Sequence, residues 1–171
     1  DGLPTVGVLL PYMPIHYDLF SQLETDALVF TSGNLSDHPI WIDVTSAKMH
    51  LSKAGIQLPL VDHQREIVNR ADDSVVQIVD KQVQIIRRSR GYVPSSISLP
   101  VCAEGVFAVG AELSHTFCIG KGKKALLSQY IGDLKTQDSM DFFLEAWERY
   151  RKLFRFKPEY VACDLHPDYT S

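Results

Sequence analysis

The chain has 171 residues, of which 45% are hydrophobic and 22% are charged, and its formal net charge at neutral pH is −4. This composition is typical of a globular protein with one domain or two small ones, and the acidic balance argues against nucleic acid as a partner. No apolar run approaches the roughly 20 residues that a membrane span needs, and no signal peptide is recognisable, so we expect a cytoplasmic protein that does not enter a membrane.

The first 94 residues are predicted to form an α+β region. Apolar runs at 5–10 and 27–30 each predict a strand. Between these strands we expect a helix over 15–23, with Pro14 well placed in its first turn. The chain begins with Asp-Gly-Leu-Pro and not with methionine, so we expect it to be a piece of a longer protein.

A hairpin is predicted further along this region. A short helix over 45–53 precedes it, and residues 74–79 alternate between apolar and polar side chains, as a half-buried strand does. A second β run at 82–87 follows, so the two runs should pair around Asp80-Lys81.

A linker and a second unit come next. Residues 93–100 contain two prolines and three serines without periodicity, and we expect residues 95–104 to connect two domains. Strands are then predicted at 105–110, 115–120 and 124–130, and their short connections predict a β-meander.

A long amphipathic helix is predicted over 140–153. Its apolar residues recur at three- and four-residue steps, which places them on one face. Asp138 or Ser139 is the expected capping residue. A last strand at 160–163 precedes the polar segment Asp-Leu-His-Pro-Asp-Tyr, so the second domain should cover residues 105–171.

The spacing of cysteines and histidines predicts no metal site within this chain. Cys102, Cys118 and Cys163 form no CxxC pair, and the six histidines show no HxxxH or HExxH spacing. Zinc sites use such pairs, whereas isolated thiols are typical of a reducing compartment.

The first candidate site lies where the predicted strand at 27–30 ends. Thr31, Ser32 and Asn34 surround Gly33 and place hydrogen-bond donors and acceptors at a strand end. Open α/β sheets bind ligands at such positions. The same residues could equally form a turn that only ends the strand.

Arginines extend this candidate site. Arg70 and Ser74 precede the predicted hairpin, and Arg87, Arg88 and Arg90 end it. Guanidinium groups bind phosphates through a fixed bidentate fork, although many arginine clusters are ion pairs on a solvated face. Three arginines in four residues, between an apolar strand and a glycine, favour an anion site. Successive strand residues alternate sides, so Arg87 and Arg88 should point in opposite directions.

The order of these motifs resembles the second half of a Sua5/YrdC-type domain, a family that binds ATP and makes acyl-adenylates. The segments Thr-Ser-Gly-Asn-Leu-Ser, Arg-Ala-Asp-Asp-Ser-Val-Val and Arg-Arg-Ser-Arg-Gly-Tyr-Val-Pro are most similar to the HypF family. The resemblance implies a twisted mixed sheet for residues 1–94. It also implies nucleotide or phosphate contacts by Thr31, Ser32, Asn34, Arg70, Ser74, Arg87, Arg88 and Arg90.

The segment after the linker resembles the start of the Kae1-like domain that follows in HypF, with its opening β-meander and helix. There, a hairpin of this kind turns beside a nucleotide phosphate. The site candidates that this resemblance suggests are Glu112, Thr116, Asp133, His166 and Asp168. Without the resemblance, turn formation and loop capping would account for the acidic ones.

The resemblance implies a carbamoyltransferase of [NiFe]-hydrogenase maturation. Its substrates would be carbamoyl phosphate and ATP with Mg, and its acceptor the C-terminal cysteine of HypE. Carbamate would be activated as carbamoyl-adenylate and then transferred for cyanide ligand synthesis. The family's Lys-x-Arg element and its zinc and Kae1-type metal sites would lie outside this chain, so we expect the fragment to be incomplete for activity and assign no catalytic residue.

Three other functions stay open from the sequence. A threonylcarbamoyl-adenylate synthase of tRNA modification shares the first fold, although a Kae1-like start is not expected after it. A non-catalytic interaction fragment would have no affinity for ATP. A basic cavity for nucleic acid, which this fold can hold, fits poorly with the net charge of −4.

Overall fold

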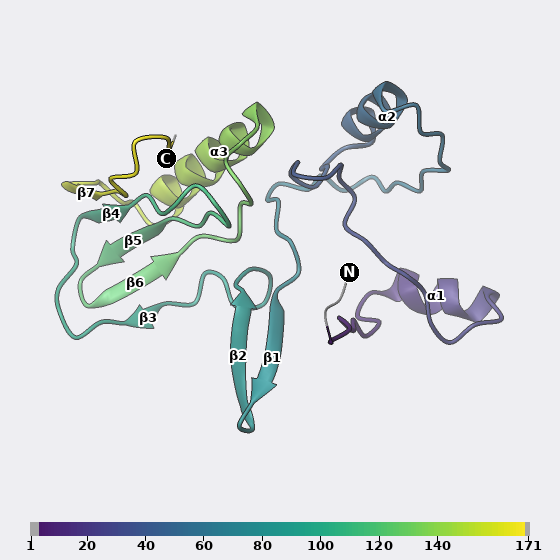
Figure 1. Cartoon of the computed structure of the whole chain (residues 1–171), viewed down its shortest axis with the longest axis horizontal. Helices are drawn as coiled ribbons and strands as arrows, with labels where there is room; N and C mark the ends of the chain where they lie inside the picture. The colour runs from purple at the N-terminus through teal and green to yellow at the C-terminus, as the bar shows by residue number, and fades with distance from the viewer. Residues whose placement is uncertain (1–3, 170–171) are drawn as a thin grey trace. The chain divides into compact units, whose positions relative to one another are not determined.

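The structure is a computed structural model that describes residues 4–169. It divides into two compact units, the first ending at Thr31 and the second beginning at Ser32. Its helices and separate β-sheets confirm the α+β class (Figure 1). No helix in the described part of the chain is long and apolar enough to cross a bilayer.

The described residues of the first unit, 4–31, contain one helix, α1 (Pro14–Gln22), with a proline in its first turn as predicted. The strands predicted at 5–10 and 27–30 are not formed, because no strand pairing within residues 4–169 involves either segment. Their apolar side chains remain exposed, with Val8 82% and Val29 96% accessible. These two segments therefore contribute no strand to a sheet in the described structure.

Helix α2 (Val44–Lys53) begins the second unit's regular structure. The carboxylate of Asp43 caps it by accepting from Ser46 N at 2.8 Å. This bond satisfies one of the amide groups that a helix leaves unpaired at its start.

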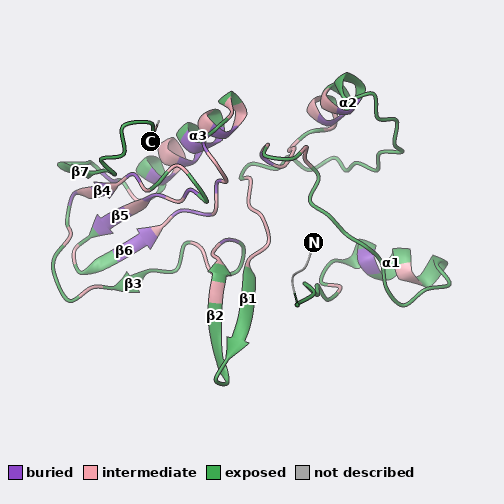
Figure 2. Ribbon diagram, in the orientation of Figure 1, coloured by how far each residue is buried: buried purple, intermediate pink, exposed green. Residues whose placement is uncertain are grey.

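The predicted hairpin is confirmed as β1 (Val75–Val79) and β2 (Gln82–Arg87), which pair antiparallel. Asp80 and Lys81 both adopt positive φ, 50° and 63°, as a two-residue hairpin turn requires. Most side chains of both strands are exposed (Figure 2).

A five-stranded sheet forms the centre of the C-terminal part, in the order β3-β6-β5-β4-β7. Its strands are β3 (Ile97–Ser98), β4 (Val106–Ala108), β5 (Cys118–Lys121), β6 (Lys124–Leu127) and β7 (Tyr160–Ala162). Antiparallel pairing of β4, β5 and β6 confirms the predicted meander, and β7 lies parallel to β4. The segment predicted as a linker is not a free connection, because Ile97 and Ser98 pair with β6.

Helix α3 (Gln137–Leu153) packs on this sheet and closes the main hydrophobic core. Phe117 and Ile119, both fully buried, meet Phe142, Phe143 and Ala146 of the helix there. The predicted capping residue is wrong: neither Asp138 nor Ser139 caps α3. Thr136 does so, accepting from Ser139 N at 3.2 Å.

Candidate functional site

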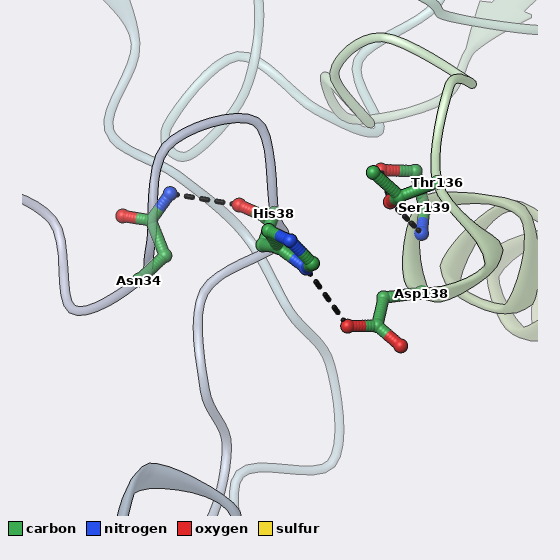
Figure 3. A network of polar contacts seen from close by, with 5 residues as sticks. All are labelled: Asn34, His38, Thr136, Asp138 and Ser139. Atoms are coloured by element: carbon green, nitrogen blue, oxygen red, sulfur yellow. Dashed lines mark hydrogen bonds and ion pairs between the residues drawn. The ribbon is translucent and has the colours of Figure 1, made fainter. Parts of the chain in front are cut away.

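The segment Ser32–Asn34 forms a tight loop held by its own polar groups. Ser32 Oγ donates to Asn34 Oδ1 at 2.5 Å. Asn34 Nδ2 donates to the carbonyl oxygen of His38 at 2.7 Å (Figure 3). Trp41 N closes the loop by donating to Gly33 O at 2.9 Å. Asn34 is half-buried and Ser32 exposed, so the loop can present polar atoms to a ligand. Thr31, also exposed, is the last residue of the first unit.

Ser74 acts within the protein as a bridge between two chain segments. Its hydroxyl donates to Arg90 O and accepts from Ser89 N, both at 2.8 Å. The arginine-rich loop after β2 is thereby fixed against the residues before β1.

The three arginines at the end of the hairpin do not converge on one point. The Arg87 guanidinium lies 4.6 Å from the ring centre of Tyr130. Arg88 Nη2 donates to the carbonyl oxygens of Tyr92 and Ser95, each at 3.0 Å. Arg87 and Arg88 thus take different partners, consistent with alternation along a strand.

Arg90 is the most exposed of these three arginines. Its Nη2 donates to Ala71 O at 2.8 Å, and its Nε lies 3.5 Å from Asp73 Oδ1. Burial raises the pKa of the neighbouring Asp72 carboxyl, although the charge of Arg87 opposes this shift. The ion pair with Asp73 is solvated and therefore weak, so an anionic ligand could compete for Arg90.

Arg70 contacts the C-terminal part of the molecule. Its Nε lies 3.6 Å from Glu145 Oε2, and its guanidinium lies 5.5 Å from the ring centre of Phe142. Both partners are on α3. In this structure Arg70 therefore connects the segment before the hairpin to that helix.

Glu112 lies in the β4–β5 connection, and Asp133 lies in the neighbouring β6–α3 connection. Asp133 Oδ1 accepts from Ser114 N at 2.8 Å, and its Oδ2 lies 3.4 Å from Lys135 Nζ. The carbonyl oxygen of Glu112 accepts from Leu134 N at 3.0 Å. These contacts hold the two loops together, which is the loop-capping role that Asp133 would have without a ligand.

Thr116 is half-buried next to a close backbone approach at Gly110. A Cβ at Gly110 would clash with the carbonyl oxygen of Thr116, and the φ of +93° also requires glycine. The turn that the resemblance places beside a phosphate is thus sterically restricted.

His166 and Asp168 lie in an exposed turn after β7. Asp168 N donates to His166 Nδ1 at 3.3 Å, and the imidazole stacks on Tyr169 at 4.4 Å between ring centres. Within residues 4–169, no group of three or more His, Cys, Asp or Glu side chains is placed to hold a metal ion.

The sequence reasoning missed Gln129, a fully buried residue that joins the hairpin segment to the sheet. Its Nε2 donates to Asn69 Oδ1 at 3.1 Å and to Arg70 O at 3.2 Å. Arg149 Nη1 from α3 reaches the same Asn69 oxygen at 2.6 Å. Sixty residues separate Gln129 from Asn69, so no local motif could reveal the contact.

His115 is a second buried polar residue that no sequence motif identifies. It is 1% exposed, its Nδ1 lies 2.8 Å from Ala111 O, and its ring meets Phe143 edge-on. Burial lowers its pKa, so the imidazole is neutral. Its Nε2 has no hydrogen-bond partner within the described part of the chain.

Two family models divide the chain between them. The model of the Sua5/YciO/YrdC family, described as "Telomere recombination", matches residues 1–89, and the model described as "HypF Kae1-like domain" matches residues 102–171.

Individual relatives match nearly the whole chain. Carbamoyltransferase HypF of Rhizobium leguminosarum bv. viciae is 40% identical over 99% of this chain and 23% of its own length. Its counterpart from Synechocystis sp. is 40% identical over 99% of this chain and 22% of its own. A crystal structure of full-length HypF in the phosphate- and nucleotide-bound form has a TM-score of 0.88 and 42% identity, covering 99% of this chain and 27% of that chain. This chain therefore spans about a quarter of the length of the relatives it matches.

Proposed function

Because this chain belongs to the HypF family, we propose that it supplies part of an ATP-dependent site that activates carbamate and part of a unit that transfers the carbamoyl group. Residues 1–94 would form part of the YrdC-like domain, 95–104 the connection, and 105–171 the start of the Kae1-like domain. The family models matching residues 1–89 and 102–171 support this division.

The observation that carries the proposal is the polar loop at Ser32–Asn34, in a chain 42% identical to a HypF crystallised with phosphate and nucleotide. Ser32, Asn34 and Thr31 would contact the nucleotide through hydroxyl and amide groups. Ser74 would hold the loop that carries Arg87, Arg88 and Arg90, of which Arg90 is the most exposed.

The chemistry would proceed in two steps. A carbamate oxygen attacks the α-phosphorus of ATP, and pyrophosphate leaves with the electron pair of the broken P–O bond, giving carbamoyl-adenylate. A thiolate of the acceptor protein HypE then attacks the carbamoyl carbon, and AMP leaves as the S-carbamoyl group forms. Fixed cations and donors at the α-phosphate would lower the first barrier by stabilising the charge that develops there.

Magnesium would enter with the nucleotide. Mg²⁺ is commonly held by substrate phosphates and one or two carboxylates, so it does not require a preformed cluster of ligands. Arg70 would contact the nucleotide only at the edge of the site, because its guanidinium already contacts Glu145 and Phe142.

In the Kae1-like part, Glu112, Thr116, Asp133, His166 and Asp168 are the candidates for the transfer site. The restricted turn at Gly110 and the loop contacts of Asp133 support a rigid hairpin end there. A test is HypE carbamoylation by a full-length protein carrying Glu112→Gln: lost transfer with normal adenylation would support a role, and normal transfer would remove Glu112 from the site.

The match to a HypF Kae1-like domain directly after the YrdC-like segment favours this function over a threonylcarbamoyl-adenylate synthase. The following experiment distinguishes this function from that of a non-catalytic interaction fragment.

The test is Asn34→Ala in the full-length protein, measured by carbamate-dependent ATP–pyrophosphate exchange. Losing a hydrogen bond to the nucleotide should lower exchange about tenfold or more. Ser36→Ala is the matched control, because Ser36 is exposed two residues further along the same loop. Equal exchange in the two variants would contradict the proposal.

A further inference from the structure

Helix α3 presents a carboxylate that its own capping does not use. Thr136 is the N-cap, and its hydroxyl accepts from Ser139 N at 3.2 Å (Figure 3). Asp138, in the first turn, instead reaches out of the helix: its Oδ2 lies 2.9 Å from His38 Nδ1. An acidic residue is favourable in a first turn in any case, so the helix tolerates this arrangement without strain.

The partner of Asp138 belongs to the loop that carries the proposed nucleotide contacts. The carbonyl oxygen of His38 accepts from Asn34 Nδ2 at 2.7 Å, while the imidazole of the same residue meets Asp138. His38 therefore connects the Asn34 side chain to the start of α3, and 100 sequence positions separate His38 from Asp138.

We infer that His38 and Asp138 are positioning residues through which the start of α3 holds the Ser32–Asn34 loop in the form that contacts nucleotide. The identity of the ligand in this inference rests on the proposed function. The contact between His38 and Asp138 is independent of that function. Holding the loop in advance removes part of the ordering cost that nucleotide binding would otherwise carry.

The expected effect is modest because both side chains are partly solvated, at 32% for His38 and 44% for Asp138. Solvated pairs contribute weakly, so the link should tune affinity and leave the chemical step intact. A role limited to general stability would instead lower the active fraction and leave the KM for ATP unchanged.

The experiment uses the full-length protein with Asp138→Ala. We expect the KM for ATP in the exchange reaction to rise about fivefold, with kcat changed less than about twofold. Amide hydrogen exchange should become faster in peptides covering residues 32–41. Asp138→Glu keeps a carboxylate and should restore much of both properties.

Asp141→Ala is the matched control, since Asp141 is an exposed carboxylate one turn further along α3 whose partner is the Gln137 side chain. His38→Ala keeps the carbonyl oxygen that Asn34 uses. If the two side chains act through each other, adding it to Asp138→Ala should cause little further change.

The inference is overturned if Asp138→Ala matches Asp141→Ala in both loop exchange and KM, or if it loosens the loop without changing KM while Asn34→Ala impairs activity. If Asn34→Ala leaves activity unchanged, the proposed function fails. The hydrogen-exchange comparison of the two aspartate variants then decides whether the link exists.

Discussion

The apolar residues near the N-terminus and those in and beside β5 have opposite exposures. Val8 and Val29 are 82% and 96% accessible, whereas Phe117 and Ile119 are completely buried. Both groups lie in short apolar runs of similar composition. The difference is that α3 packs over the second group. Its backbone is also satisfied, because β4 and β6 pair with β5 at Ile119 and Ser128 bonds to the amide and carbonyl of Phe117.

This comparison shows that an apolar run forms a strand only when a neighbouring strand pairs with it and another element covers its side chains. Backbone amide and carbonyl groups need a neighbouring strand, and apolar side chains need a covering element. Within the described residues, the segments at 5–10 and 27–30 have no paired strand, so their composition alone does not produce one.

The largest effect expected from this contrast is at Phe117. Phe117→Ala should cost about 3–5 kcal/mol, since it leaves a cavity among the rings of Phe107, Phe143 and Tyr150. Val29→Ala should change local stability by less than about 0.5 kcal/mol. Native-state hydrogen exchange of peptides around each position in the full-length protein measures both. Equal losses of stability at the two sites would contradict the conclusion that only Phe117 is packed in a core.

A smaller effect is expected at Gln129, where the hairpin segment meets the sheet. Gln129→Leu removes the donors to Asn69 and Arg70 and should cost about 1–2 kcal/mol, seen as faster exchange in residues 69–92. The control is Gln84→Leu, an exposed hairpin glutamine bonded to Gln77, which should have little effect. If both variants leave exchange unchanged, Gln129 does not join the two parts.

The smallest effect is a pH dependence from His115. Burial lowers its pKa from the ordinary 6.5, so below about pH 6.5 the unfolded chain binds a proton that the folded chain does not. Stability of the sheet should therefore fall as pH drops from 6.5 towards the folded pKa, by at most about 1.4 kcal/mol per pH unit. His115→Gln should lose this part of the slope, measured by exchange in β5 corrected for intrinsic rates. An identical slope in the variant would show that the imidazole is not buried as described.

Local patterns predicted the elements whose partners are near in sequence. The β1–β2 hairpin depends on two turn residues, and the meander on short connections, so both are confirmed. The prediction of the capping residue of α3 was wrong because Thr136, Asp138 and Ser139 are all good capping residues and lie within four positions. The pairing of Ile97 with β6 could not be predicted, since the prolines and serines around it are typical of a linker.

The candidate site could be predicted only in part, because many of its residues contact partners that are distant in the sequence. Ser32 and Asn34 bond to each other within one loop, but the strand predicted to lead into them is not formed in the described structure. The partners of the arginines are distant: Tyr130 for Arg87 and Glu145 for Arg70. No spacing rule connects such pairs, so their roles as nucleotide contacts remain predictions.

The parallel pairing of β4 with β7 has a consequence for how the chain folds. Phe107 opposes Val161, and β5, β6 and α3 lie between them in the sequence. Contacts this far apart in sequence form slowly because a large loop must close first, whereas a meander forms from local contacts. On the ribosome, β4 to β6 can pair while α3 is still being synthesised. Their apolar face then stays exposed until the helix packs on it. A pause or a truncation before residue 154 would leave that face open to aggregation.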